Sequence, residues 1–300
     1  MNKLLEKKLK NYLPQDIAMF LKKNIVSKPR YWFQLKQAQE GFNKFSNLYP
    51  QNLIFIAGLP KSGTSWLKKM ICCYQGYQEV MIPEANAYEI NHGGSHDFDL
   101  PEDTFIRLKN KLVVLKLHVH GSEHNLNLLE NGQIPFVVIY RDLRDVAVSY
   151  YFYVKQTPWH PQYHLYKNLT VEDGLKFFAE NLLCEYAKWI ESWTKTTENS
   201  LRLIIRYEDL LSNPEIELSK IAKHCALDNS PQKIRKIVEI NSFSNLSGGR
   251  NKGNESSNSF FRKGVAGDWK NHFTPNLKNI YKEKIGDFLV DFNYEKDLDW

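Results

Sequence analysis

The stretch that decides the fold reads LIFIAGLPKSGTSW and occupies residues 53–66. Its first part is a short apolar run of the kind found in strands buried on both faces. A turn with two glycines follows and leads into a predicted helix from about Thr64. The start of a helix offers free N–H groups and the positive end of a dipole. Together with the charge of Lys61 and the hydroxyl groups of Thr64 and Ser65, this segment predicts an anion cradle.

The cradle departs from the nucleoside-triphosphate loop G-x-x-x-x-G-K-[ST]. That loop requires a Lys directly after its second Gly. Here Thr64 follows Gly63, and Lys61 comes two residues before that glycine. A P-loop phosphotransferase is therefore an alternative hypothesis that this spacing disfavours.

Further apolar segments alternate with helical ones along the chain. We expect three more strands, at Leu112–His118, Pro135–Arg141 and Leu201–Tyr207. We expect helices through Asp145–Lys155, after Asn213–Pro214, and as one long amphipathic helix over Glu172–Thr197. This alternation predicts an α/β fold, in which a single domain over residues 51–300 holds a mostly parallel sheet flanked by helices. Ligands of such sheets bind outside the carboxyl ends of the strands.

Residues 1–50 form a basic N-terminal segment with nine Lys and one Arg against three acidic residues. We predict a helical arm of short helices broken at Pro14 and Pro29. A basic amphipathic arm could lie on an anionic membrane as a peripheral contact. The alternative, which we favour, is an arm docked on the domain, and its predicted anchors are Trp32, Phe33 and Phe42.

The composition is that of a globular protein, with 42% hydrophobic and 25% charged residues. The first ten residues are charged and lack the apolar block of a signal peptide. The longest apolar runs are too short to span a bilayer. The four Cys include no C-x-x-C pair, which favours reduced thiols. We therefore expect a soluble cytoplasmic protein with no integral membrane contact and no nucleic-acid partner.

A second basic segment, YRDLRDVAVSYY, occupies residues 140–151 at the end of a predicted strand. Arg141 can grip a phosphate in a bidentate fork. Ser149 can come alongside it two helical turns later. On these residues alone, a surface cluster of ion pairs is the alternative.

A third segment, FRKGVAGDWKN, occupies residues 261–271. Two neighbouring cations followed by a glycine form an anion nest, and a basic surface loop is the alternative. Residues 244–259 come just before it and are rich in Ser, Asn and Gly. We interpret this stretch as a lid, with a plain exposed loop as the alternative.

Together the three segments resemble the cytosolic-type sulfotransferases, which use 3′-phosphoadenosine 5′-phosphosulfate (PAPS). Residues 60–66 match that family's 5′-phosphosulfate loop, P-K-S-G-T-[ST]-W, and residues 262–269 match its R-K-G-x-x-G-D-W motif. Residues 141–149 resemble its 3′-phosphate motif. The resemblance implies a P-loop-like phosphosulfate loop and a cofactor site made of Lys61, Ser62, Gly63, Thr64, Ser65, Trp66, Arg141, Ser149, Tyr207, Asn241, Phe243, Arg262, Lys263 and Gly264.

Three of these residues, Trp66, Tyr207 and Phe243, look like adenine contacts by their positions. The family usually has Thr where this chain has Asn241. An Asn side chain can still hydrogen-bond a base.

The catalytic residues are implied by Lys116-Leu117-His118, which resembles the K-x-H of the family. A period of two places Lys116, His118 and His120 on one face of the strand. The resemblance makes His118 the general base and gives Lys61 and Lys116 the task of stabilising charge. His120 is an alternative base. No metal is required in this interpretation, and the product of PAPS is 3′,5′-ADP.

A nucleotide-binding module that has lost catalysis is the last alternative. The presence of Lys61, Lys116 and His118 argues against it. We expect the acceptor to be a small molecule, while the choice between a hydroxyl and an amine stays open.

The acceptor site is the part that the sequence defines least. The order of segments points to residues 81–100 and 150–166 and to the lid. The candidates, each of which could equally be ordinary packing, are Tyr88, His92, Phe98, Tyr153, Trp159 and His160. The first region is also acidic, which leans toward a polar or cationic acceptor or else marks a solvated loop; its acids are Glu84, Glu89, Asp97 and Asp99.

The oligomeric state also stays open between monomer and dimer. Many relatives dimerise through a K-x-x-x-T-V-x-x-x-E segment. The corresponding stretch here, residues 270–279, has Pro275 in place of Val and Asn279 in place of Glu.

Overall fold

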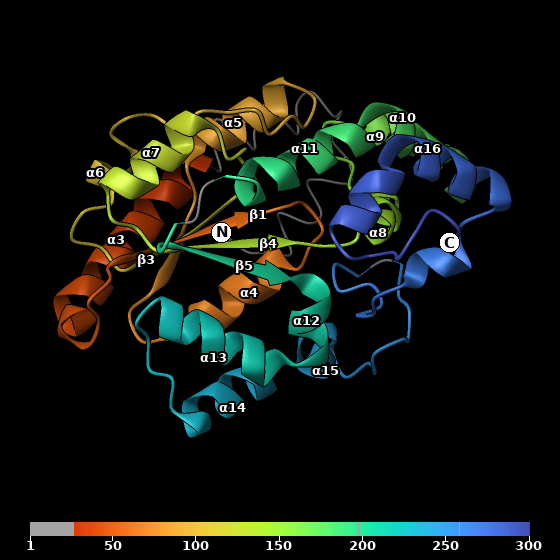
Figure 1. The fold of residues 1–300 in the computed structure, drawn as a ribbon. Coiled ribbons are helices and arrows are strands. Elements are labelled where there is room, and N and C mark those ends of the chain that lie inside the picture. The colour runs from red at the N-terminus through yellow and green to blue at the C-terminus, as the bar shows by residue number, and fades with distance from the viewer. Residues whose placement is uncertain (1–26, 197–198, 258) are drawn as a thin grey trace.

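The computed structural model describes residues 27–196, 199–257 and 259–300. A five-stranded sheet in the order β2-β3-β1-β4-β5 lies at its centre, and every strand pair in it is parallel (Figure 1). The strands are β1 (Leu53–Gly58), β2 (Gln78–Val80), β3 (Val113–Leu117), β4 (Phe136–Tyr140) and β5 (Arg202–Arg206). The expected α/β class is confirmed. The edge strand β2 was not expected, because a three-residue segment reading QEV has no apolar pattern.

Helices cover both faces of this sheet. One face packs against α8 (Leu143–Lys155), α10 (Val171–Asn181), α11 (Leu183–Thr194) and α16 (Pro275–Asp291). The other packs against α4 (Thr64–Ile71), α12 (Tyr207–Ser212), α13 (Pro214–His224) and α14 (Pro231–Ile240). Alternate β1 side chains enter the two cores: Phe55 enters the first, while Ile54 and Ile56 enter the second. Burial on both faces explains why β1 reads as an uninterrupted apolar run.

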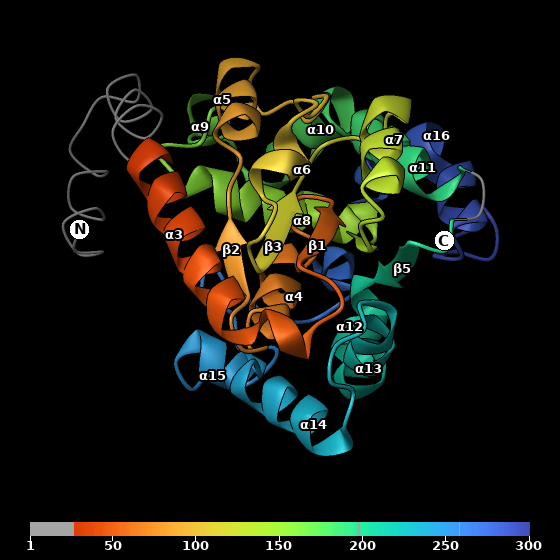
Figure 2. The ribbon, with the colours of Figure 1, turned by 90° about the vertical axis from the view of Figure 1, so that its left-hand side faces the viewer.

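Short helices lie in the connections between these strands and helices, and Figure 2 shows them around the sheet. They are α5 (Pro83–Asn91), α6 (Thr104–Arg107), α7 (Glu123–Asn131), α9 (Tyr163–Tyr166) and α15 (Phe243–Ser247), with 3₁₀ turns η2 (Ser46–Leu48) and η3 (Asp268–Asn271). Helix α15 occupies the start of the stretch that we interpret as a lid. Within the described residues, no helix is both long and apolar enough to cross a membrane. All four Cys are free thiols.

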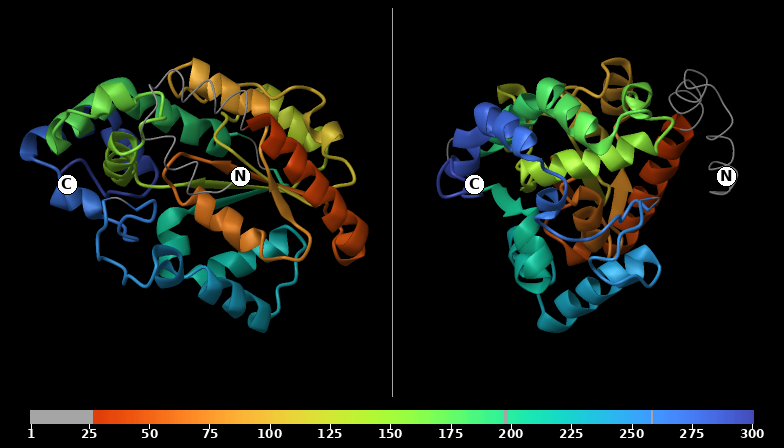
Figure 3. Two further views of the ribbon diagram at one scale, coloured as in Figure 1. Left: turned by 180° about the vertical axis from the view of Figure 1, so that it is seen from behind. Right: turned by 90° about the vertical axis from the view of Figure 1, so that its right-hand side faces the viewer.

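The described part of the N-terminal arm is one helix, α3 (Ser27–Phe45), packed along β2 at the sheet edge (Figure 3). The predicted break at Pro29 is wrong, because Pro29 lies in the first turn, where its missing N–H costs no helical hydrogen bond. The predicted break at Pro14 lies outside the described residues. Figure 3 places α3 and the C-terminal end on opposite sides of the molecule.

The predicted docking anchors of this arm are only partly right. Phe42 packs against the core, but Trp32 and Phe33 are 67% and 61% exposed. Side chains one helical turn apart, Tyr31, Leu35 and Ala38, are buried instead. The helix therefore docks through the face that carries Leu35 and turns Trp32 and Phe33 outward.

The long helix predicted over Glu172–Thr197 is also wrong, because two helices occupy the region. They meet at Leu182, whose φ of −127° and ψ of −25° leave the helical range. Both Leu182 and Leu183 are buried, so the apolar pattern continues through the break. A hydrophobic period alone cannot reveal such a change of direction.

The strand register brings the functional segments to one edge of the sheet. Ala57 pairs with Leu117, and Gly58 pairs with Ile139. The chain leaving β1, β3 and β4 therefore emerges at neighbouring points. These exits carry the cradle after β1, His118 after β3 and Arg141 after β4.

Candidate active site

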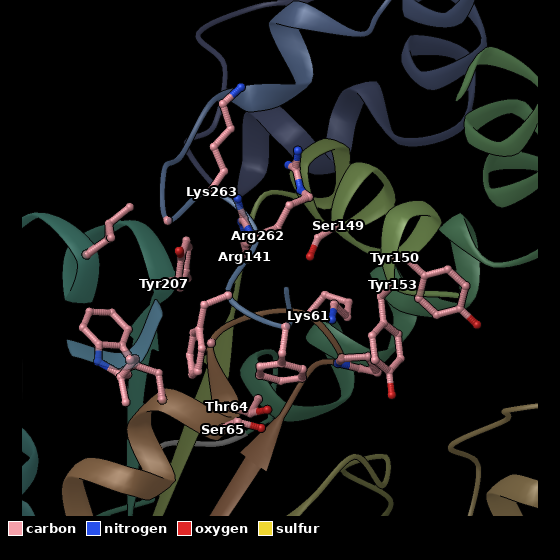
Figure 4. A pocket seen from close by; sticks show the side chains of 18 of the residues that line it. Lys61, Thr64, Ser65, Arg141, Ser149, Tyr150, Tyr153, Tyr207, Arg262 and Lys263 are labelled. Atoms are coloured by element: carbon pink, nitrogen blue, oxygen red, sulfur yellow. The ribbon is translucent and has the colours of Figure 1, made fainter. Parts of the chain in front are cut away.

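A cavity of about 270 Å³ lies at the carboxyl ends of β1, β3 and β4 (Figure 4). All the residues implied for the cofactor line it except Ser62. Lys116 and His118 line it as well. Three segments that are far apart in sequence therefore meet around one space, as Figure 4 shows for Lys61, Arg141 and Arg262.

The cradle holds its shape through backbone conformations that few residues adopt. Lys61 has a φ of 66° and Gly63 a φ of 79°. A Cβ on Gly63 would lie 2.7 Å from the Tyr207 ring, so only glycine fits there. The N–H of Leu59 donates to the Ile139 carbonyl at 3.0 Å and ties the loop to β4.

Ser62 differs from the other implied cofactor residues. Its side chain is fully buried and does not line the cavity. Its N–H donates to the Leu59 carbonyl at 3.2 Å, and so belongs to the turn itself. Because Lys61 adopts a left-handed conformation, the chain turns at this point, and Ser62 faces the core.

Lys61 extends from the cradle into the cavity. Its Nζ lies 3.8 Å from the centroid of the Tyr153 ring and 5.0 Å from that of Phe260. Burial and the nearby cations, with Arg141 first among them, lower the pKa of Lys61 to about 7. Such a group changes its charge readily when an anion approaches.

The second segment binds the third through one buried carboxylate. Asp145 accepts hydrogen bonds from the N–H groups of Gly267 at 2.7 Å and Trp269 at 2.9 Å. It also accepts from Arg141 at 3.1 Å, and Arg141 in turn donates to the Val265 carbonyl at 2.9 Å. Burial disfavours the Arg141 charge, but Asp145, Tyr207 and Glu208 together outweigh it and raise the pKa of that guanidinium. The Arg141 guanidinium also lies 4.4 Å from the centroid of Tyr207.

The other arginine of this segment has a structural position. Arg144 is buried and pairs with Asp142 and Glu295. Its guanidinium lies 3.9 Å from the Trp269 ring and 4.4 Å from the Trp300 ring. A surface cluster of ion pairs is thus the wrong interpretation of this segment, because both arginines are buried.

The third segment presents its cations beside a carboxylate. Arg262 and Lys263 both pair with Asp268 and Glu255. Gly264 has a φ of 68°, and a Cβ there would overlap the Phe243 ring. The chain at Gly264 therefore lies flat against an aromatic side chain that lines the cavity.

Trp66, Tyr207 and Asn241 form the end of the cavity away from β3. The Trp66 Nε1 donates to the Asn241 carbonyl at 2.8 Å, and the Trp66 and Tyr207 rings meet edge to face. The Asn241 amide donates to the Ile237 carbonyl at 2.9 Å. These bonds fix two flat aromatic surfaces that suit a purine ring.

His118 is held in one tautomer at the end of β3. Its Nδ1 faces the Gly58 carbonyl, which can only accept, so Nδ1 carries the proton. Its Nε2 is then the unprotonated nitrogen, and it accepts a hydrogen bond from the Lys116 Nζ at 2.9 Å. Burial, and after it the positive charge of Lys116, hold the pKa of His118 well below its usual range. The ring is therefore neutral at pH 7. Burial also lowers the pKa of Lys116, to about 8.

His120 does not share this position. It does not line the cavity, and its Nε2 is buried without a hydrogen-bond partner among the described residues. Its N–H donates to the His96 carbonyl at 3.1 Å. The strand ends at Leu117, so the period of two that grouped His120 with His118 does not continue.

The family model described as Sulfotransferase domain matches residues 51–289. The chain belongs to the sulfotransferase family. Cytosolic sulfotransferase 1 of Arabidopsis thaliana is 25% identical over 289 residues, which cover 85% of each chain. Sulfotransferase 1B1 of Canis lupus familiaris is 27% identical over 275 residues, 81% of this chain and 86% of its own.

Solved structures of similar proteins share the fold. Mouse sulfotransferase SULT7A1 complexed with PAP has a TM-score of 0.59 and 22% identity, covering 86% of this chain and 95% of its own. Retinol dehydratase in complex with androsterone and inactive cofactor PAP has a TM-score of 0.57 and 18% identity, covering 84% and 86%. The central sheet with helices on both faces is thus the fold of known sulfotransferases.

This sulfotransferase divides the predicted acceptor residues among three places. Tyr153 and His160 line the main cavity. Tyr88 and Phe98 line a second cavity of about 160 Å³, which shares four wall residues with the first: Glu89, His96, Lys116 and His118. His92 stacks on Tyr88 with ring centroids 3.9 Å apart, and neither it nor Trp159 lines either cavity.

Sequence reasoning missed several residues in the walls of the main cavity. They are His96, Tyr150, Tyr186, Leu246, Lys252, Phe260 and Phe261, together with Gly94, Leu211 and Val265. Glu89, which the sequence marks only as one acid of the acceptor region, lines the cavity as well. One signal was available for Tyr150, which lies three residues before Tyr153 on α8 and therefore shares its face. Tyr186 comes from α11, and nothing in its own segment marks it.

Proposed function

We propose that this sulfotransferase moves the sulfuryl group of PAPS to a hydroxyl or amine of a small-molecule acceptor, with His118 as general base. The observation that carries the proposal is the His118 tautomer. The ring is neutral, its proton is held at Nδ1 by the Gly58 carbonyl, and its Nε2 faces the cavity beside Lys116. A base of this kind is typically worth about 10²–10⁴-fold in rate.

The residues around the cavity fit the PAPS molecule. The cradle offers helix N–H groups, Thr64 and Ser65 for the 5′-phosphosulfate. Arg141, Ser149, Arg262 and Lys263 supply a second set of anion-binding groups, which suits the 3′-phosphate. The Cβ clashes at Gly63 and Gly264 show that the backbone comes as close to the ring walls as glycine allows.

The chemical step follows from these positions. PAPS supplies the sulfuryl group and a good leaving group, 3′,5′-ADP. As the acceptor oxygen attacks sulfur, its proton passes to His118 Nε2, and the bond between sulfur and the phosphate oxygen breaks. Lys61 stabilises the charge that develops on that oxygen, and Lys116 neutralises the transferring group. The acceptor group must first take the place of Lys116 at His118 Nε2.

The acceptor is proposed to be small because the space is limited. The reacting group lies near His118 in the main cavity, next to Tyr153 and His160. The rest of the acceptor extends past the shared wall toward Tyr88 and Phe98 in the second cavity. Concave sites that combine aromatic walls with a few placed polar groups, as on this side of the cavity, are typical of small-molecule sites.

Thermal unfolding with 3′,5′-ADP, compared with ATP plus Mg²⁺, tests the proposal. A ligand at about 100 times its Kd stabilises the protein by about 2.7 kcal/mol and raises the midpoint by several degrees. We expect this shift with 3′,5′-ADP and little shift with ATP. The reverse result would overturn the proposal and favour a phosphotransferase. A panel of hydroxyl and amine acceptors, read by mass spectrometry with PAPS, then tests turnover with and without EDTA.

A further inference from the structure

Glu89 of α5 is the only acidic side chain among the described residues that line the main cavity. The same cavity is lined by six basic side chains, of Lys61, Lys116, Arg141, Lys252, Arg262 and Lys263. A carboxylate here does nothing for an anionic cofactor, which it repels. Its presence therefore calls for a separate explanation.

The other acids of the region are engaged elsewhere. Glu84 pairs with Arg107 at 2.7 Å, and Asp99 accepts a hydrogen bond from Ser122. Asp97 lines neither cavity, whereas Glu89 lines both. In the described part of the chain, the Glu89 carboxylate forms no hydrogen bond or ion pair. The acidic character expected from the sequence thus reaches the cavity through one residue.

Aromatic side chains share the main cavity with this carboxylate. Tyr150, Tyr153 and Tyr186 line the cavity from α8 and α11. Burial is the main cause that raises the pKa of Tyr153, and the negative charge of Glu89 is the second. It also contributes to raising those of Tyr150 and Tyr186. A cavity that combines a carboxylate with aromatic side chains is a favourable setting for an organic cation, since both attract positive charge.

We propose that the acceptor has an aromatic body and a positively charged amino group, and that Glu89 pairs with that amino group. The inference rests on the proposed function and narrows its substrate class. A free cation would be repelled by the Lys and Arg side chains of this cavity, so it needs the one carboxylate present. A protonated amine has no lone pair and cannot attack sulfur. The acceptor therefore reacts through a hydroxyl at its other end, near His118.

A matched pair of acceptors tests this assignment. Tyramine carries a phenol and an ammonium group, while 4-propylphenol has nearly the same shape without the charge. We expect the wild-type protein to prefer tyramine in kcat/KM. Glu89→Gln should lower kcat/KM for tyramine about ten- to hundredfold, mainly through KM, because a desolvated charge pair is lost. The value for 4-propylphenol should change by less than about threefold.

Glu84→Gln is the matched control, because Glu84 lies on the same helix and lines neither cavity. Glu84→Gln should leave kcat/KM unchanged for both tyramine and 4-propylphenol. The charge of Glu89 also favours the protonated form of Lys116 and works against the burial that lowers its pKa. An equal loss for both acceptors in Glu89→Gln would overturn the proposal, since Glu89 would then act through Lys116. The absence of a tyramine preference in the wild-type protein would overturn it as well.

Binding keeps the proposal testable if neither phenol is turned over. Calorimetry of tyramine with the 3′,5′-ADP complex should show binding by the wild-type protein and weaker binding by Glu89→Gln. Tyramine that binds both proteins equally, or neither, would overturn the acceptor assignment. Failure of the sulfotransferase proposal is separate, because it appears as a missing 3′,5′-ADP shift in thermal unfolding.

Discussion

The proposed nucleotide half and the proposed acceptor half of this cavity are built in different ways. The nucleotide half uses three continuous segments that hydrogen bonds from backbone N–H groups fasten together. The Leu59 N–H donates to β4, and the N–H groups of Gly267 and Trp269 donate to the Asp145 carboxylate. The acceptor half uses single side chains from α5, α8, α11 and the loop near Phe260. Phosphate groups need several N–H groups and cations in fixed places, which requires a contiguous motif. An acceptor needs only a matching shape and a few polar contacts.

His118→Ala removes the proposed general base, which lies where the two halves meet, and gives the largest expected effect. Turnover should fall about 10²–10⁴-fold, because the base that accepts the acceptor proton is lost. The Kd for 3′,5′-ADP should stay nearly unchanged. Single-turnover kinetics with PAPS and calorimetry with 3′,5′-ADP measure the two quantities.

His120→Ala is the matched control for that variant, because His120 does not line the cavity. It should keep most of the turnover. Near-full turnover by His118→Ala, or a large loss in His120→Ala with normal stability, would contradict the assignment of the base.

The difference between the halves also explains how much the sequence could predict. The motif residues come together as expected, because strand order and register bring the ends of β1, β3 and β4 to one edge. Ser62 does not line the cavity, because the left-handed Lys61 turns the loop, and no spacing rule shows this. Tyr186 was missed, and Glu89 could not be distinguished from the other acids of its region, because their positions depend on how α5 and α11 pack. Trp32 and Phe33 look like anchors by type, but only the docked face of α3 decides burial.

The next prediction concerns stability within the nucleotide half. Arg144→Ala leaves Asp142 and Glu295 without their cation and opens the space between Trp269 and Trp300. Breaking a buried ion pair typically costs about 3–5 kcal/mol in the free energy of unfolding. Urea unfolding should show this loss. A loss below about 1 kcal/mol would mean that the ion pairs of Arg144 contribute no more than exposed surface pairs do.

Arg141→Ala is the functional counterpart in the same segment. It should weaken 3′,5′-ADP binding by about 2–3 kcal/mol, because a charged partner of the 3′-phosphate is lost. The affinity for 5′-AMP, which lacks that phosphate, should change much less. Calorimetry with both nucleotides decides this. An equal loss for the two nucleotides would mean that Arg141 does not bind the 3′-phosphate.

A proton should enter the nucleotide half when the cofactor product binds. Burial and its cationic neighbours lower the pKa of Lys61 to about 7, so at pH 8 this amine is mostly neutral. Phosphates with a second pKa of about 6 are already fully charged at pH 8 and favour the ammonium form. Binding should take up close to one proton per 3′,5′-ADP, roughly the neutral fraction of Lys61 at that pH. The affinity should then fall as the pH rises above 8.

Calorimetry at pH 8 in two buffers of different ionisation enthalpy measures this uptake. In Lys61→Met it should be strongly reduced, because the titrating amine is gone. An unchanged uptake in that variant would assign the proton to another group, such as Lys116, whose pKa burial lowers to about 8.

The smallest expected effect comes from Tyr153, which touches both halves. Its ring lies 3.8 Å from Lys61 Nζ, and it also lines the acceptor side of the cavity. Tyr153→Leu should weaken 3′,5′-ADP binding about two- to fivefold, because a cation–π contact is worth about 0.5–1 kcal/mol. Tyr153→Phe keeps the ring and should bind as the wild-type protein does. If both variants change only the KM of the acceptor, Tyr153 belongs to the acceptor half alone, and the halves are energetically independent at this point. Weaker 3′,5′-ADP binding in Tyr153→Leu alone would instead show that the Tyr153 ring couples the two halves.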